Sequence, residues 1–146
     1  MEPKSETLIL FENDLHVSTL ENILRNSRSV FIILLGNAQR KIKLSEAVLS
    51  FKQQIVLEFI KQFDNVTQID PLKLNETLIT IDQLDMIYPG VGENNDFINS
   101  FKKLNNKVIF NLVRDQDLFA WKFAKKGFFK FKENIPKINQ YVFQNY

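Results

Sequence analysis

Residues 29–35, with the sequence SVFIILL, are the most strongly apolar stretch of this 146-residue chain. A strand that is apolar on both faces is typical of the centre of a parallel sheet, because helices cover both faces of such a sheet. The polar loop GNAQRK follows at residues 36–41. Residues 29–35 therefore predict a central strand whose carboxyl end runs into a polar loop.

Segments that resemble strands and helices alternate on both sides of this strand. The other predicted strands are residues 7–11, 66–69, 107–113 and 128–132. In the last of these, Phe129 and Phe131 alternate with Lys130 and Lys132, as on a half-exposed edge strand.

Helices are predicted between the strands. They cover residues 18–25, after a capping box at Ser18 and Glu21, and residues 44–63; two more begin at Asp96 and after Asp117. Residues 76–88 are ambiguous and fit a helix better than a strand. This alternation predicts a single α/β domain over residues 1–146, doubly wound, with a mainly parallel five-stranded sheet and helices on both faces.

The composition excludes several kinds of site. The chain has no cysteine, one histidine and four glycines, which excludes thiol chemistry, Cys-ligated metals, multi-histidine zinc sites and glycine-rich phosphate loops. The N-terminus, MEPKSETLI, lacks the layout of a signal peptide, and no apolar run is long enough to span a membrane. We therefore expect a cytoplasmic protein without a membrane partner.

Charge is distributed unevenly along the chain. Residues 1–100 contain nine basic and fourteen acidic residues, whereas residues 101–146 contain ten basic and three acidic residues. This asymmetry indicates a polyanion or an acidic partner near the C-terminal part, unless the two parts neutralise each other in the fold.

Acidic residues follow two of the predicted strands. Glu12 and Asp14 follow the first strand, and Asp115 and Asp117 follow residues 107–113. If these strands are neighbours, the four carboxylates meet at the carboxyl edge of the sheet, where such folds bind ligands. The alternative is that these residues only cap the helices that follow.

Two further acids, Asp82 and Asp85, lie on the presumed helix and could point to the same place. Clustered carboxylates hold Mg²⁺ or Mn²⁺, and such an ion can activate water for attack on a phosphodiester. The sequence therefore allows a metal site at the carboxyl edge.

Four segments, in this order, resemble the PIN-like/NYN nuclease superfamily, most closely a bacterial PIN-like group. They are residues 7–24, 30–42, 81–90 and 108–129. GNAQRK at residues 36–41 is similar to the Gly-x-x-Gln-x-Lys loop of that group. Asp82 matches the acid in the middle helix of that group. Asp115-Gln-Asp117 matches the Asp-rich turn of that group. Each motif is weak alone, and the resemblance lies in their order and spacing.

The resemblance implies the strand order 3-2-1-4-5, with residues 7–11 beside residues 107–113. It also implies a ribonuclease that depends on Mg²⁺ or Mn²⁺. Its catalytic residues would be Glu12, Asp82, Asp115 and Asp117, and Asp14 would join them as a metal ligand. Gln39, Arg40 and Lys41 would contact the phosphates of a nucleic acid.

The chain departs from the family at Leu10, which stands where the family has its leading catalytic aspartate. This change implies either a relocated metal site or none. Two functions therefore stay open: a ribonuclease, or a module without catalysis that binds nucleic acid or protein.

The C-terminal part interleaves aromatic and basic residues, as surfaces that bind nucleic acid do. The candidate contacts are Lys125, Lys126, Lys130 and Lys132. The alternative is a helix and an edge strand with phenylalanines inward and lysines outward. Residues 133–146 form an aromatic tail, which we expect either to pack on its own domain or to dock into a protein partner or a second copy.

Overall fold

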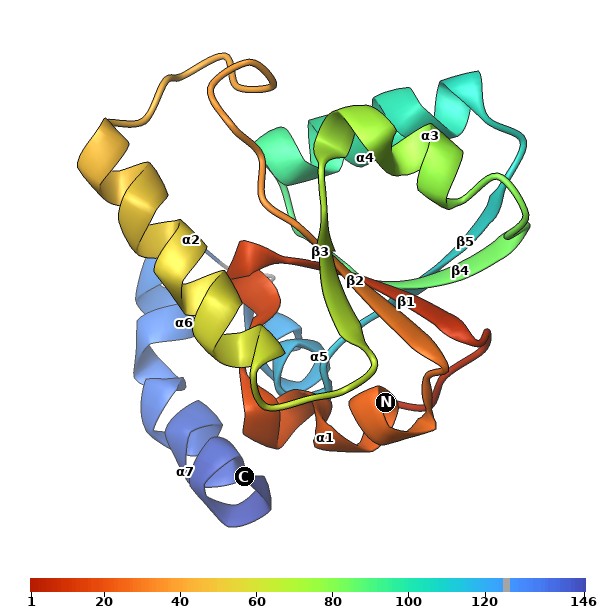
Figure 1. The fold of residues 1–146 in the computed structure, drawn as a ribbon. Helices are drawn as coiled ribbons and strands as arrows, with labels where there is room; N and C mark the ends of the chain where they lie inside the picture. The colour runs from red at the N-terminus through yellow and green to blue at the C-terminus, as the bar shows by residue number, and fades with distance from the viewer. Residues whose placement is uncertain (125–126) are drawn as a thin grey trace.

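The protein forms one all-parallel five-stranded sheet in the order β3-β2-β1-β4-β5 (Figure 1). The computed structural model describes residues 1–124 and 127–146. The strands are β1 (Thr7–Phe11), β2 (Ser29–Ile33), β3 (Val66–Ile69), β4 (Gln83–Ile87) and β5 (Val108–Leu112). The α/β class, the parallel direction and the order 3-2-1-4-5 are confirmed, but the fourth and fifth strands are residues 83–87 and 108–112 and not the predicted residues 107–113 and 128–132.

Helices cover both faces of the sheet (Figure 1). The helices are η1 (Glu12–Asp14), α1 (Val17–Asn26), α2 (Glu46–Ile60), η2 (Pro71–Lys73), α3 (Leu74–Thr77), α4 (Glu93–Leu104), α5 (Asp115–Trp121), α6 (Phe128–Glu133) and α7 (Ile135–Asn145). Helices α1 and α2 lie on one face, α3 and α4 on the other, and α5 to α7 extend past the carboxyl edge on the side of α2. No helix in the described residues is both long and apolar enough to cross a membrane.

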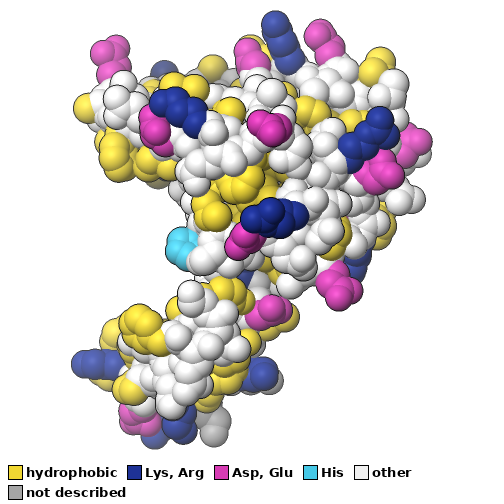
Figure 2. All heavy atoms as spheres, turned by 60° about the horizontal axis from the view of Figure 1, so that its bottom comes forward, with side chains coloured by type: hydrophobic (Ala, Val, Ile, Leu, Met, Phe, Trp, Pro, Cys, Tyr) yellow, Lys and Arg dark blue, Asp and Glu magenta, His cyan; other side chains and the backbone are white. Residues whose placement is uncertain are grey.

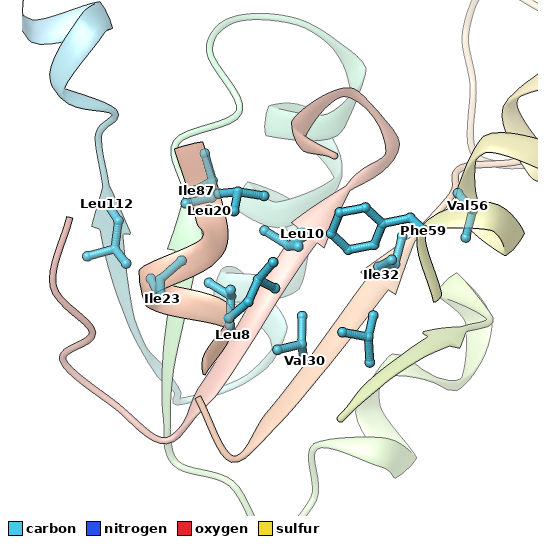
Figure 3. Packing of buried hydrophobic residues seen from close by; sticks show 12 residues of the cluster. Leu8, Leu10, Leu20, Ile23, Val30, Ile32, Val56, Phe59, Ile87 and Leu112 are labelled. Atoms are coloured by element: carbon cyan, nitrogen blue, oxygen red, sulfur yellow. The ribbon is translucent and has the colours of Figure 1, made fainter. Parts of the chain in front are cut away.

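Two apolar clusters, one on each face, hold these layers together. Figure 3 shows the first, in which side chains of the sheet such as Leu8 and Leu10 pack against Ile23 of α1 and Phe59 of α2. The second joins β1, β2 and β4 to α3 and α4. Because β1 and β2 are covered on both faces, they have the apolar sequences expected of central strands.

The helical interpretation of residues 76–88 is wrong, because residues 83–87 form β4. Its side chains alternate: Leu84 and Met86 belong to the cluster under α3 and α4, and Ile87 belongs to the opposite cluster. The apparent helical period included Leu78, which instead packs at the end of α3. Two short elements in succession thus imitate one helix.

The predicted edge strand at residues 128–132 is also wrong, because these residues belong to helix α6. The alternation of two phenylalanines and two lysines is too short to distinguish a strand from one and a half turns of helix. On this side of the sheet the edge strand is β5, and β4 separates β5 from β1. Residues 7–11 and 107–113 are therefore not neighbours, contrary to the expectation.

The ends of the helices differ slightly from the prediction. Helix α1 begins at Val17 with His16 as its N-cap, so the predicted capping box at Ser18 does not form. Helix α2 begins after Ser45, whose hydroxyl accepts the N–H of Val48 at 3.3 Å. Helix α4 begins at Glu93, three residues before Asp96.

Candidate functional site at the carboxyl edge of the sheet

Acidic side chains gather where β1 and β5 end. Glu12 and Asp14 lie in η1, directly after β1, and both are buried. Asp115 and Asp117 lie in the first turn of α5, after β5. Asp14 interacts electrostatically both with Glu12 and with Asp117, even though β4 separates the two strands.

Glu12 is held by two cations of the same chain. Its Oε1 accepts hydrogen bonds from Nη2 of Arg40 and from Nζ of Lys52, each at 3.1 Å. Its side chain is only 2% exposed. Two ion pairs at a buried carboxylate offset the cost of removing its charge from water.

Arg40 connects Glu12 to the start of α4. Its Nη1 donates to Oε2 of Glu93 at 3.0 Å, and its Nε donates to the carbonyl of Leu35 at 2.9 Å. Oε1 of Glu93 accepts the backbone N–H groups of Lys41 and Ile42 at 2.7 and 3.0 Å. These bonds lower the pKa of Glu93 below its usual value, and the bond from the N–H of Ile42 has the largest effect. Glu93 therefore fastens the loop after β2 to α4.

Glu93→Ala is expected to release this loop. The amides of Lys41 and Ile42 lose their acceptor, so their hydrogen exchange should become about tenfold faster or more. Because the folded-state pKa of Glu93 is lowered, its stabilising effect is present above pH ~4.5 and is lost as the pH falls through that lowered value. NMR hydrogen exchange measures this effect. Glu46→Ala, which removes an exposed acid at the start of α2, should leave both amides unchanged.

Asp14 is the most perturbed acid of this edge. Its Oδ2 accepts the N–H of Phe11 at 3.2 Å. Burial raises the pKa of Asp14 to about 6, although the N–H of Phe11 and the guanidinium of Arg114 act in the opposite direction. Arg114 is itself paired with Asp117, with 2.7 Å between Nε and Oδ2.

Asp115 lies farther out. Its side chain is about half exposed, and its Oδ2 is 3.6 Å from the amino group of Met1. Asp115 and Asp117 both help to raise the pKa of Tyr146, which burial raises most. The end of α7 therefore returns to the start of α5.

Asp82 does not join these acids. It is exposed and directly precedes β4, at the amino edge of the sheet, where its carbonyl accepts the N–H of Val108 at 2.9 Å. The expectation that Asp82 points to the carboxyl edge therefore fails, because residues 83–87 form a strand and place Asp82 at that strand's opposite end.

Asp85 has a role that the sequence did not reveal. It is fully buried within β4, and its Oδ2 accepts the N–H groups of Lys4 and Ser5 at 2.7 and 2.8 Å. Asp85 thus anchors the N-terminal segment across the sheet, away from any catalytic cluster. The available signal was a lone acid in the otherwise apolar stretch LDMI at residues 84–87.

The residues present do not fit a Mg²⁺ or Mn²⁺ ion. Glu12 is already paired with Arg40 and Lys52, and Leu10 lies fully buried in the apolar cluster of Figure 3. Among the residues that the structure describes, no three Asp, Glu, His or Cys side chains are arranged to hold a metal ion. The acids instead serve as partners for cations and backbone N–H groups.

The predicted nucleic-acid contacts in the loop after β2 have different surroundings. Oε1 of Gln39 accepts the N–H of Gly36 at 3.0 Å, and Arg40, whose side chain is 9% exposed, lies between Glu12 and Glu93. Lys41 is exposed and lies 3.6 Å from Asp96. Of the three residues, only Lys41 presents a charged group to solvent.

The C-terminal helices carry the remaining predicted contacts. Lys130 and Lys132 are exposed on α6, whereas Lys125 and Lys126 lie outside the described residues. Phe128 and Phe129 are 69% and 79% exposed, so the expectation of inward-facing phenylalanines is wrong for both. We call Phe128, Phe129, Lys130 and Lys132 the aromatic-basic surface. Figure 2 shows hydrophobic and basic side chains mixed on the lower lobe, which these helices form.

The aromatic tail packs on its own domain at one end. Tyr141 of α7 stacks on Phe119 of α5, with 4.2 Å between the ring centroids, and α5 is joined to the end of β4 by an edge contact of Trp121 with Tyr88. Phe143 is 85% exposed. The tail is therefore attached on one side and open on the other.

The comparisons with known proteins give no family assignment. Neither the models of known protein families nor the curated proteins contain a match to this sequence.

Proposed function

We propose that this protein is a PIN-like module that binds single-stranded RNA without cleaving it. The exposure of Phe128 and Phe129 beside Lys130 and Lys132 carries this proposal. Exposed aromatic rings provide faces on which unpaired bases stack, and neighbouring lysines attract the phosphates. The surplus of basic residues in the C-terminal part also favours binding of the RNA phosphates.

The lysines of this surface are accessible to phosphates. Lys130 forms an ion pair with Glu133 at 3.1 Å, but both side chains are more than 60% exposed. Such a pair contributes little, so a phosphate can replace the carboxylate.

The carboxyl edge supports binding over cleavage. The carboxylates of Glu12 and Asp117 are already paired with cations of the chain, which compensate the negative charge that a divalent ion would bind, and Asp82 lies at the other edge. The family's chemistry relies on an acid at the position of Leu10, which is buried among apolar side chains. A catalytic ion would therefore lack most of its ligands.

Replacing the aromatic rings tests stacking. Stacking on one ring contributes about 1–3 kcal/mol, so Phe128→Ala/Phe129→Ala should weaken binding of a labelled oligouridine about tenfold or more. Fluorescence anisotropy measures the dissociation constant. Ile79→Ala/Leu104→Ala, which removes two exposed apolar side chains elsewhere, is the matched control and should bind like the parent.

Replacing the lysines tests the phosphate contacts. Each phosphate contact to single-stranded nucleic acid contributes about 0.7 to the slope of log affinity against log salt. Lys130→Gln/Lys132→Gln should therefore flatten this slope by about 1.4, whereas Lys102→Gln/Lys103→Gln on α4 should change it little. Equal effects of the two lysine pairs would contradict a defined RNA surface. Absence of RNA binding by the parent would leave the open side of the tail as a site for a protein.

A further inference from the structure

Glu12 has an unusual environment for an acid. It is almost fully buried, yet Oε1 alone accepts both ion pairs, and Oε2 has no hydrogen-bond partner in the part of the chain that the structure describes. A buried carboxylate that loses its cations is strongly destabilising. The two cations therefore compensate the burial of this carboxylate.

The two cations come from separate elements and are fixed by other contacts. Arg40 lies in the loop after β2, and its Nε and Nη1 are held by Leu35 and Glu93. Lys52 lies on α2 and also donates to Oδ1 of Asn13 at 3.3 Å. The side chain of Arg40 is 9% exposed and that of Lys52 is 22% exposed, so solvent screens these pairs only weakly.

We infer that Arg40 and Lys52 are built-in counter-cations that occupy the place a divalent ion would take beside Glu12. Together they carry two positive charges, the charge of Mg²⁺ or Mn²⁺, and both meet the same oxygen at 3.1 Å. Asp14 lies close enough to Glu12 to interact with it electrostatically. RNA binding at α6 is not needed for this role.

Removing both cations should convert the edge into a metal-responsive site. Arg40→Gln/Lys52→Gln leaves both oxygens of Glu12 unpaired beside Asp14, and such carboxylates attract Mn²⁺. A ligand that binds only the folded state stabilises that state. Millimolar MnCl₂ should therefore raise the Tm of this variant by about 3–6 °C and that of the parent by less than about 1 °C.

Two controls separate this effect from general electrostatics. Lys41→Gln/Lys43→Gln removes two positive charges, as the test variant does, from the loop that holds Arg40, but neither lysine pairs with Glu12, so this control should respond to MnCl₂ like the parent. NaCl at equal ionic strength should not replace MnCl₂. The inference is overturned if the parent shows the same Tm rise as Arg40→Gln/Lys52→Gln, or if that variant folds and shows none.

A third substitution keeps the test decisive if the double variant does not fold. Glu12→Gln removes the charge that the two cations serve. The triple variant Glu12→Gln/Arg40→Gln/Lys52→Gln should therefore fold, have a higher Tm than the double variant and lose the response to MnCl₂. A triple variant that is no more stable than the double variant would overturn the inference, because Glu12 would then not be the reason for the cations.

Discussion

Asp85→Ala should lower the free energy of unfolding by about 3 kcal/mol. Its carboxylate is fully buried and accepts two backbone N–H groups, from Lys4 and Ser5, so both donors lose their partner in the variant. A hydrogen bond to a charged acceptor contributes about 1.5–3 kcal/mol, and the cavity left by the buried side chain adds to the loss. The N-terminal segment should detach from the sheet as a result.

Urea unfolding measures this loss, and hydrogen exchange of the amides of Lys4 and Ser5 reports the detachment. Asp82→Ala is the matched control, because Asp82 is exposed and lies three residues earlier in the chain. It should change the free energy of unfolding by less than about 0.5 kcal/mol. Similar losses in the two variants would contradict the anchoring role of Asp85.

Asp14→Asn should stabilise the protein at neutral pH by about 2–3 kcal/mol. Burial raises the pKa of Asp14 from 3.8 to about 6, which means that the folded state disfavours the charged form. Asparagine removes that charge and keeps an oxygen that can accept the N–H of Phe11.

The pH dependence follows from the direction of this shift. Below pH ~3.8 Asp14 is protonated in both states and contributes no difference. Between pH ~4 and ~6 only the unfolded state loses its proton, so the parent becomes less stable relative to Asp14→Asn as the pH rises. Above pH ~6 the full difference is present.

Urea unfolding of the parent and Asp14→Asn at several values of pH measures this difference. The exposed Asp64 provides the control, and Asp64→Asn should follow the parent at every pH. A gain in stability from Asp14→Asn that is the same at pH 3.5 and pH 8 would show that charge is not its cause.

The sequence predicted the central strands well because burial on both faces leaves a continuous apolar run. Residues 29–33 are such a case, and β1 and β2 pair along their full length. The prediction from sequence failed at residues 83–87, where Asp85 interrupts the apolar pattern. That acid lies in the core only because the distant N-terminal segment supplies its hydrogen bonds, and local periodicity contains no information about such a partner.

The candidate site was predictable only in part. The rule that loops after parallel strands share one edge predicted Glu12, Asp14 and Asp117 at the carboxyl edge, and η1 and α5 do follow β1 and β5 there. The rule cannot tell which cations reach them. Lys52 is 40 residues from Glu12 in the sequence and meets it only because α2 packs beside η1. A pattern of acids therefore suggested a metal site where the fold supplies internal cations.

The most direct test of the account is the anisotropy of a fluorescein-labelled oligouridine, followed over hours with the parent protein in a buffer that contains Mn²⁺. RNA binding without cleavage predicts a rise to a plateau that then stays constant and that decreases when salt is added. A rise followed by a steady fall would indicate cleavage, and no rise at low salt would exclude RNA binding. Either of these two results would contradict the proposed function.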